Sequence, residues 1–95
     1  MPITKKVVFI AKDECIQELK DLLITMIDAS REEAGCLLYN IYQITEKPTE
    51  FVVVETWENQ EYLNAHGKTD HYNHYKAHFE PFTADKYKDD MSILG

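Results

Sequence analysis

The sequence predicts a single α+β domain whose strands and helices follow the order β-α-β-β-α-β. Two observations predict this class. Segments rich in β-branched and aromatic residues alternate with segments of helical periodicity, and capping or turn residues separate them. A chain of 95 residues is long enough for one hydrophobic core and too short for two. We therefore expect one domain spanning residues 1–95, with a four-stranded antiparallel sheet and its helices on one face.

The first two elements are a strand and a long helix. Residues 3–12 are rich in β-branched side chains and predict a strand that ends before Asp13, a residue suited to cap a helix. Residues 14–33 carry apolar side chains at helical spacing, and Gly35 follows as a stop signal. The apolar stripe consists of Ile16, Leu19, Leu22, Leu23, Met26 and Ile27.

A hairpin follows the helix. Residues 36–44 and 51–57 form two extended, largely apolar runs, and the polar, proline-containing segment 45–50 between them suits a turn. These two runs should pair as neighbouring antiparallel strands.

The last third of the chain predicts two short helices and a weak strand. Asn59 can cap a helix that ends near Gly67, and Thr69 or Asp70 can cap another that Pro81 stops. The final strand is indicated by alternating apolar residues, namely Tyr87, Met91 and Ile93.

Both faces of the predicted hairpin are apolar. Leu37, Tyr39 and Ile41 should share one face of the strand over residues 36–44. Leu38, Tyr42 and Ile44 should share the other, and the strand over residues 51–57 divides similarly. Antiparallel sheets with one wet face normally alternate apolar and polar residues, so a second subunit is expected to cover the face without helices. A symmetric homodimer is the simplest such arrangement.

The composition limits the partners. The formal net charge of -7 and the pI near 4.9 argue against binding to nucleic acids or anionic membrane surfaces, since both are polyanions. The sequence contains no apolar run long enough to span a membrane and no signal-type segment, and its two isolated cysteines suit reduced thiols. We expect a cytoplasmic protein whose ligand is a small molecule.

Glu55 and Trp57 should share a face of their strand with Phe51 and Val53, which places a carboxylate among large apolar groups. Desolvation raises the pKa of a carboxyl group in such a setting, and this would suit a general base. The alternative is a glutamate at the strand edge that contacts water or an arginine.

Three histidines lie on one arc of the last predicted helix. His71, His74 and His78 have the spacing i, i+3 and i+7, which could bind a metal such as zinc. No HExxH pattern accompanies them, so we favour a solvated histidine face beside an aromatic stripe and predict no metal site. That stripe consists of Tyr72, Tyr75, Phe79 and Phe82.

His66 lies near the end of the short helix, just before Gly67. A neutral imidazole there could accept a proton from an acidic substrate at physiological pH. Alternatively, its charged form would only stabilise the helix C-terminus.

Three segments together resemble the antibiotic biosynthesis monooxygenase domain family. They are residues 30–39 (SREEAGCLLY), 51–57 (FVVVETW) and 62–66 (YLNAH), in this order. The resemblance covers nearly the whole chain. It implies a ferredoxin-like protomer that forms a dimeric α+β barrel. Known activities of the family include cofactor-free oxidation of quinols and polyketide phenols, haem degradation and isomerisation of a phosphorylated signalling sugar.

The quinol monooxygenase branch implies a mechanism without a bound cofactor. A base deprotonates an electron-rich phenol in a largely dry cavity, the anion passes an electron to oxygen, and a peroxide collapses to a quinone. By this resemblance His66 is the candidate base. Glu55 and Trp57 complete the predicted catalytic residues and help to position the substrate. The predicted substrate-binding residues are Tyr39, Asn40, Tyr72 and Phe79.

Other functions stay open. The haem-degrading branch uses an asparagine on the first strand, and residues 3–12 contain none, which argues against haem chemistry. An isomerase of a small phosphorylated metabolite is an alternative, although Arg31 is the only arginine. A non-catalytic dimeric ligand-binding or stress protein is another, since a fold does not fix a function.

Overall fold

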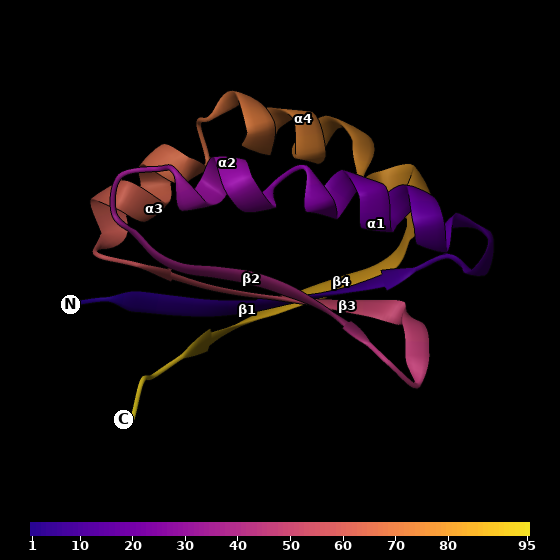
Figure 1. The fold of residues 1–95 in the computed structure, drawn as a ribbon, viewed down its shortest axis with the longest axis horizontal. Coiled ribbons are helices and arrows are strands. Elements are labelled where there is room, and N and C mark those ends of the chain that lie inside the picture. The colour runs from indigo at the N-terminus through magenta and orange to yellow at the C-terminus, as the bar shows by residue number, and fades with distance from the viewer.

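The computed structural model describes residues 1–95 as one layer of helices on a four-stranded sheet (Figure 1). The strands are β1 (Ile3–Ala11), β2 (Cys36–Ile44), β3 (Lys47–Trp57) and β4 (Thr83–Met91). The helices are α1 (Ile16–Ile24), α2 (Ile27–Arg31), α3 (Gln60–His66) and α4 (Asp70–His78). Two single-turn 3₁₀ helices, η1 (Asp13–Cys15) and η2 (Glu80–Phe82), complete the chain. The predicted ferredoxin-like α+β class is confirmed.

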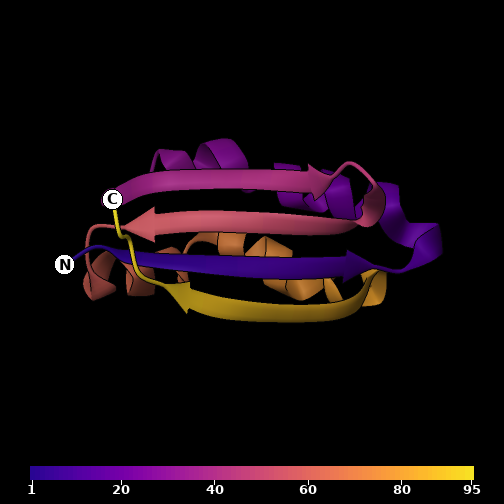
Figure 2. The ribbon, with the colours of Figure 1, turned by 90° about the horizontal axis from the view of Figure 1, so that it is seen from below.

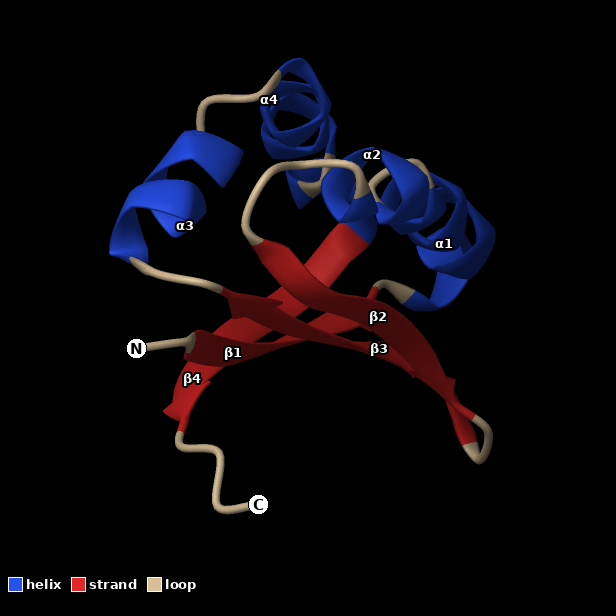
Figure 3. Cartoon of the chain, turned by 60° about the vertical axis from the view of Figure 1, so that its left-hand side comes forward, coloured by secondary structure: helices blue, strands red, loops and turns tan.

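The sheet is fully antiparallel, in the order β2-β3-β1-β4 (Figure 2). Val7 of β1 lies opposite Val53 of β3, and Val8 lies opposite Val52. Because neighbours along a strand point to opposite faces, Val7 and Val53 face the helices while Val8 and Val52 face away. All four helices lie on one side of the twisted sheet, as Figure 3 shows.

The hydrophobic core fills the space between the sheet and the helices. Twelve buried residues form it, with Trp57 and Leu19 fully buried at its centre. The strand side supplies Phe9, Ala11, Tyr39, Phe51, Val53 and Trp57, and the helical side supplies Leu19, Leu22, Leu23, Met26, Tyr75 and Phe79. Four of the six residues of the predicted apolar stripe therefore lie in the core, and Ile16 packs against it.

The helix-free face of the sheet is only partly apolar. Val8 is buried there by its neighbours, whereas Leu38, Tyr42, Tyr87 and Met91 are exposed. Polar groups lie among them, including Lys6, Asn40 and the hydrogen-bonded pair Thr4 and Thr56. The apolar residues predicted for this face are therefore present, but polar side chains lie between them.

Leu37 does not share a face with Tyr39 as predicted. Cys36 pairs with Trp57 and Leu38 pairs with the next residue, Thr56, so Leu37 is the extra residue of a β-bulge. The bulge breaks the alternation and leaves Leu37 exposed. The faces assigned to Leu38, Tyr39, Ile41 and Tyr42 hold, and a second irregularity in the ladder lies between Gln43 and Ile44.

The predicted helix over residues 14–33 is in fact two helices with a break at Thr25 and Met26. The hydroxyl of Thr25 donates to the carbonyl of Leu22 at 2.6 Å, and the amide of Met26 donates to that of Leu23 at 3.0 Å. Such side-chain competition and tighter i to i−3 bonding end a helical run. Asp13 is not a cap either, because the chain enters α1 through η1 and no side chain caps it.

Two strand boundaries also differ from those predicted. β3 begins at Lys47, so the turn contains only Thr45 and Glu46. Pro48 is tolerated because β1 pairs with β3 only from Glu50 onward, which leaves the proline beyond that ladder.

β4 covers residues 83–91, starting earlier than the apolar residues suggested, and Ile93 lies outside it. Its charged residues suit an edge strand, and Asp90 pairs with Lys5 of β1 at 2.7 Å.

The predicted caps of the later helices are confirmed. The side chain of Asn59 accepts the amide of Tyr62 at 3.1 Å, and that of Thr69 accepts the amide of Tyr72 at 3.3 Å. Gly35 has a φ of +80°, the left-handed conformation that favours glycine after a helix. No helix in the structure has both the length and the apolar character needed to cross a membrane.

Candidate active site

A cavity of about 590 Å³ opens between the sheet and helices α3 and α4. The sheet supplies apolar and aromatic side chains together with four charged ones, namely Lys5, Glu55, Lys86 and Lys88. Helices α3 and α4 supply further polar and aromatic side chains. The residues that line it include His66, Glu55, Tyr39, Tyr72, Tyr75 and Lys86. The size is that of a pocket for a small organic molecule.

Four of the predicted site residues meet at this cavity. His66 ends α3, Glu55 lies on β3, Tyr39 lies on β2, and Tyr72 lies on α4. The His66 ring centre is 5.9 Å from that of Tyr39 and 5.2 Å from that of Tyr72. Of the three predicted catalytic residues, His66 and Glu55 line this cavity and Trp57 does not.

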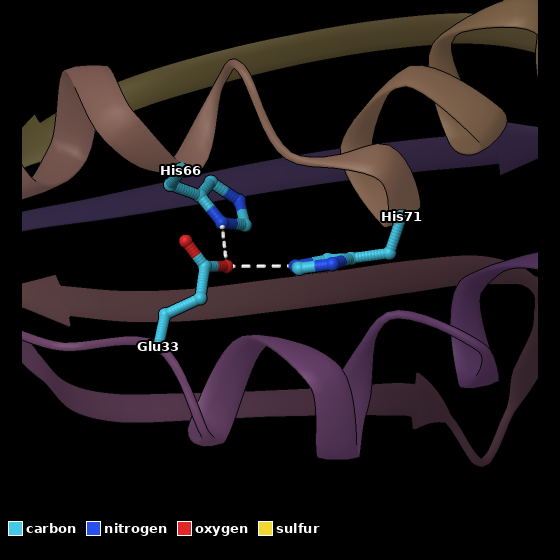
Figure 4. A group of neighbouring side chains, drawn as sticks. All are labelled: Glu33, His66 and His71. Atoms are coloured by element: carbon cyan, nitrogen blue, oxygen red, sulfur yellow. Dashed lines mark hydrogen bonds and ion pairs between the residues drawn. The ribbon is translucent and has the colours of Figure 1, made fainter.

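His66 is held by a carboxylate that the sequence did not single out (Figure 4). Its Nδ1 atom lies 2.6 Å from Oε2 of Glu33, in the turn between α2 and β2. The same oxygen lies 2.7 Å from Nε2 of His71 at the start of α4. Because an ionised carboxylate only accepts hydrogen bonds, both ring nitrogens that face Glu33 carry hydrogen in this arrangement.

The other ring nitrogen of His66 is therefore the basic one. Nε2 of His66 makes no hydrogen bond within the chain, and the atom is accessible to solvent. His66 itself is only 3% exposed, so its ring is rigidly placed while this one atom stays accessible. Trp57 packs against the ring at 4.6 Å between centres and Thr69 donates to the His66 carbonyl at 2.8 Å, so both restrain the end of α3.

Glu55 is buried, and its partner is Trp57. The indole Nε1 of Trp57 donates to Oε1 of Glu55 at 2.9 Å. Trp57 is fully buried and does not line the cavity, so it acts on the site through Glu55 and His66. The alternative in which an arginine binds Glu55 is wrong, because Arg31 instead donates to Tyr39 and Asn40.

Two predicted substrate-binding residues do not reach the cavity. Asn40 points to the helix-free face of the sheet, where Arg31 and Tyr42 bind its side chain. Phe79 is a core residue, stacked on Tyr75 with ring centres 5.0 Å apart. Asn40 alternates with Tyr39 along β2, so a residue next to a cavity residue lies on the opposite face.

Tyr75 and Lys86 are cavity residues that sequence reasoning missed. Nζ of Lys86 donates to the hydroxyl of Tyr75 at 2.6 Å. Burial, and then the charges of Lys76 and Lys88, lower the pKa of Lys86 to about 8. Burial also raises the pKa of Tyr75 above its ordinary value. No sequence pattern marks Lys86, because it enters the cavity through the register of β4, which places it opposite Phe9 of β1.

The histidines of α4 divide between two environments. His74 and His78 are exposed with ring centres 4.5 Å apart, which agrees with the predicted solvated face. His71 instead turns toward Glu33. The three predicted positions therefore do not gather around one point.

A different trio could hold a metal ion. One ligand atom each from Glu33, His66 and His71 lie within 4.8 Å of one another. Two imidazole nitrogens and a carboxylate suit a first-row divalent metal. In the structure both imidazoles contact the same carboxylate oxygen at hydrogen-bond distances, so a metal would have to replace these two bonds.

A comparison with protein families gives one match that covers most of the chain. A family model described as antibiotic biosynthesis monooxygenase matches residues 2–78. A curated relative, sll1783 of Synechocystis, an uncharacterised protein, is 30% identical over 59 residues. The matched region covers 62% of this chain and 40% of that relative, so the match spans less than half of the relative's length.

Solved structures share the whole architecture. PA3566 of Pseudomonas aeruginosa matches with a TM-score of 0.94 at 26% identity, covering 99% of this chain and 95% of its own. Rv0793 of Mycobacterium tuberculosis matches with a TM-score of 0.92 at 24% identity, covering 100% and 97%.

A candidate antibiotic biosynthesis monooxygenase of Nitrosomonas europaea matches with a TM-score of 0.91 at 21% identity, covering 98% and 90%. The likeness to it and to Rv0793, both under 25% identical, is evidence for the fold alone.

Proposed function

Because the chain belongs to the antibiotic biosynthesis monooxygenase family, we propose that it oxidises a small phenol or quinol with molecular oxygen and needs no bound cofactor. The observation that carries this proposal is the pairing of His66 with Glu33 at the wall of an aromatic cavity. A carboxylate that orients a histidine and leaves its second nitrogen accessible is a recurring arrangement for a general base.

The chemistry begins with proton transfer from the substrate hydroxyl to Nε2 of His66. Glu33 stabilises the positive charge that the ring gains, and the aromatic walls keep water away from the anion. Tyr39 and Tyr72 lie beside His66 and would hold the substrate ring by stacking. Glu55 would accept a hydrogen bond from a second substrate hydroxyl.

The oxidation then balances without a redox cofactor. For a phenol with a hydrogen on its para carbon, the phenolate gives one electron to oxygen, and the resulting superoxide and phenoxyl radical combine at that carbon. The peroxide anion takes a proton back from His66 to form a hydroperoxide. That carbon loses its proton, the O–O bond breaks, and water leaves. The product of the phenol is a quinone that carries one oxygen atom from molecular oxygen. A quinol would instead lose two electrons and two protons to oxygen, which leaves as hydrogen peroxide.

We further propose that the protein is a homodimer. The exposed Leu38, Tyr42, Tyr87 and Met91 on the helix-free face support a partner on that side of the sheet. Because the cavity is on the opposite face, each subunit would keep its own site.

One observation favours the isomerase alternative. Lysines line the cavity and would suit a phosphorylated substrate, whereas Arg31 lies outside it. The two functions differ in their need for oxygen: the isomerase would turn over a phosphorylated metabolite under nitrogen, and the monooxygenase would not act there.

The direct test is oxygen uptake with 1-naphthol as the phenol and menadiol as the quinol. Labelled oxygen should place one heavy atom in the 1,4-naphthoquinone formed from 1-naphthol. His66→Ala should lower the rate on the order of 100-fold, as expected for loss of a general base. His74→Ala is the matched control, because His74 is an exposed histidine of α4 outside the cavity, and its rate should be unchanged. Full activity in a folded His66→Ala protein would remove His66 as the base.

A further inference from the structure

The charge of the cavity is opposite to that of the protein. The chain has a formal net charge of -7, yet four of the residues that line the cavity are lysines and only Glu55 is acidic. The lysines are Lys5, Lys68, Lys86 and Lys88. An acidic protein that gathers cations around a single pocket creates a local field that attracts anions.

Lys86 is the lysine that reaches deepest among the aromatic rings. Its Nζ atom lies 4.7 Å from the ring centre of Phe79, 5.3 Å from that of Tyr75 and 5.4 Å from that of Phe9. Its hydrogen-bond partner is the neutral hydroxyl of Tyr75. Lys5, by contrast, is paired with Asp90.

No carboxylate lies within ion-pair distance of Lys86. A half-buried ammonium group without a counter-ion is costly unless a ligand supplies one. Two ring-to-ring steps, of 5.2 Å from His66 to Tyr72 and 5.4 Å from Tyr72 to Tyr75, connect the candidate base with the partner of Lys86. A flat ligand lying along these rings would meet His66 at one end and Lys86 at the other.

We propose that the cavity selects aromatic ligands that carry a carboxylate, with the carboxylate bound by Nζ of Lys86 and the hydroxyl of Tyr75. The inference rests on the proposed function for the aromatic part of the ligand, and it narrows the substrate to a phenol or quinol carboxylate. Lys88 and Lys68 contribute long-range attraction, whereas Lys86 makes the direct contact.

The proposal predicts how binding depends on pH. The pKa of Lys86 is lowered to about 8, first by burial and then by Lys76 and Lys88, against an opposing effect of Glu55. Lys86 is therefore charged below pH 8 and neutral above it. The preference for an anion should be full near pH 6.5 and should fall as the pH rises through about 8, well before an ordinary lysine loses its proton.

The test compares 2-naphthoate with 2-naphthamide. The two have nearly the same shape, differ by one charge and do not titrate between pH 6 and 10. Binding is measured by calorimetry or by the fluorescence of Trp57. At pH 6.5 the carboxylate should bind about tenfold more tightly than the amide, as expected for a charge-assisted hydrogen bond. Lys86→Gln should remove this preference, so that the two probes bind about equally.

Two control variants are measured with the same two probes. Lys86→Arg should retain the preference, and Lys47→Gln, at the start of β3 and away from the cavity, should not alter it. Should Lys86→Gln fail to fold, Lys86→Met keeps the apolar stem, and the wild-type protein gives a second measurement between pH 6.5 and 9.5. Equal binding of the two probes, or a preference that survives at pH 9.5, would overturn the proposal.

These results separate this inference from the proposed function. Neither probe is a phenol, so binding does not depend on oxygen chemistry. A preference for 2-naphthoate without oxygen uptake on any phenol would keep the anion site and reject the monooxygenase. Oxygen uptake without a preference for 2-naphthoate would keep the monooxygenase and reject the anion site.

Discussion

Nδ1 of His66 lies 2.6 Å from Oε2 of Glu33, although 33 residues separate them in the sequence. The helix α3 presents His66 at its last residue, and the turn before β2 presents Glu33. The contact therefore links the segment between β1 and β2 to the segment between β3 and β4, at the wall of the cavity. In the proposed mechanism Glu33 is a positioning residue, because it acts on the substrate only through His66.

Glu33→Gln should lower kcat on the order of 100-fold with little change in KM, since misorientation of a catalytic group typically has this effect. The amide keeps the size of the side chain but loses the charge that stabilises the protonated ring. Oxygen uptake with 1-naphthol measures the change. Glu32→Gln is the matched control, because Glu32 is exposed and makes no side-chain contact with His66. Equal rates for the two variants would contradict the positioning role.

Chelation should leave the rate of the wild-type protein unchanged. In the proposed mechanism Glu33 accepts hydrogen bonds from both His66 and His71, so it needs no metal to orient the base. Dialysis against EDTA followed by the oxygen-uptake assay measures this. A rate that is lost on chelation and restored by one divalent ion would instead assign Glu33, His66 and His71 as metal ligands.

Gly35→Ala should destabilise the protein by about 2–4 kcal/mol, the combined cost of a left-handed residue and a packing clash. The φ of Gly35 is +80°, and an added Cβ would overlap the side chain of Tyr62. Urea unfolding followed by circular dichroism measures the loss.

Gly67→Ala is the matched control for Gly35→Ala, because its φ is −67° and the nearest atom to an added Cβ is 3.5 Å away. It should change the free energy of unfolding by less than about 1 kcal/mol. An equally large loss in both variants would show that the conformation of Gly35 is not the cause.

Tyr75 should stay protonated in the folded protein when free tyrosines ionise. Burial, with the nearby Tyr72, raises its pKa above the ordinary value of 10.0. Its contribution to stability is therefore full below about pH 10 and is lost as the pH rises further, because the unfolded chain releases the proton first.

The absorbance of tyrosinate tests this expectation for Tyr75. Tyr75→Phe should leave the tyrosinate signal of the folded protein at about pH 11 unchanged. In denaturant the same variant should lose one sixth of the signal, since the chain has 6 tyrosines. A loss already visible in the folded state would mean that Tyr75 ionises normally.

The proposed dimer should sediment at twice the chain mass of 11.1 kDa at micromolar concentration. Leu38→Lys places a charge in the apolar part of the helix-free face and should weaken the dimer at least about tenfold, the effect of burying an unpaired charge. Ile24→Lys is the control, because Ile24 is an exposed apolar residue of α1, outside the sheet. A wild-type monomer under these conditions would contradict the dimer.

Much of the fold could be predicted from local patterns. Asn59 and Thr69 were identified as caps because a short polar side chain before an apolar stretch can accept the free amides of a helix. Where the structure differs from the prediction, a local interaction or irregularity overrides the periodic pattern. Thr25 broke a periodicity that otherwise continued, and the bulge at Leu37 shifted an alternation by one residue.

The candidate site was only partly predictable. His66, Glu55, Tyr39 and Tyr72 could be named from their residue types and the family resemblance, and the cavity unites them. The alternation of Asn40 with Tyr39 along the strand already placed Asn40 on the other face. Phe79 could not be excluded, because a helical stripe does not show which of its side chains line open space.

By itself, the sequence determined the order of the elements, the caps that bound the later helices, and the faces of the strands that pack against the helices. These properties follow from residue conformation and from periods of two and 3.6 residues, which act over a few positions. Only the tertiary structure decided that Glu33 reaches His66 and that Lys86 enters the cavity opposite Phe9. Such contacts depend on strand register and on the packing of distant segments. Periodicity places a side chain on a face but does not choose the group that it meets across the core.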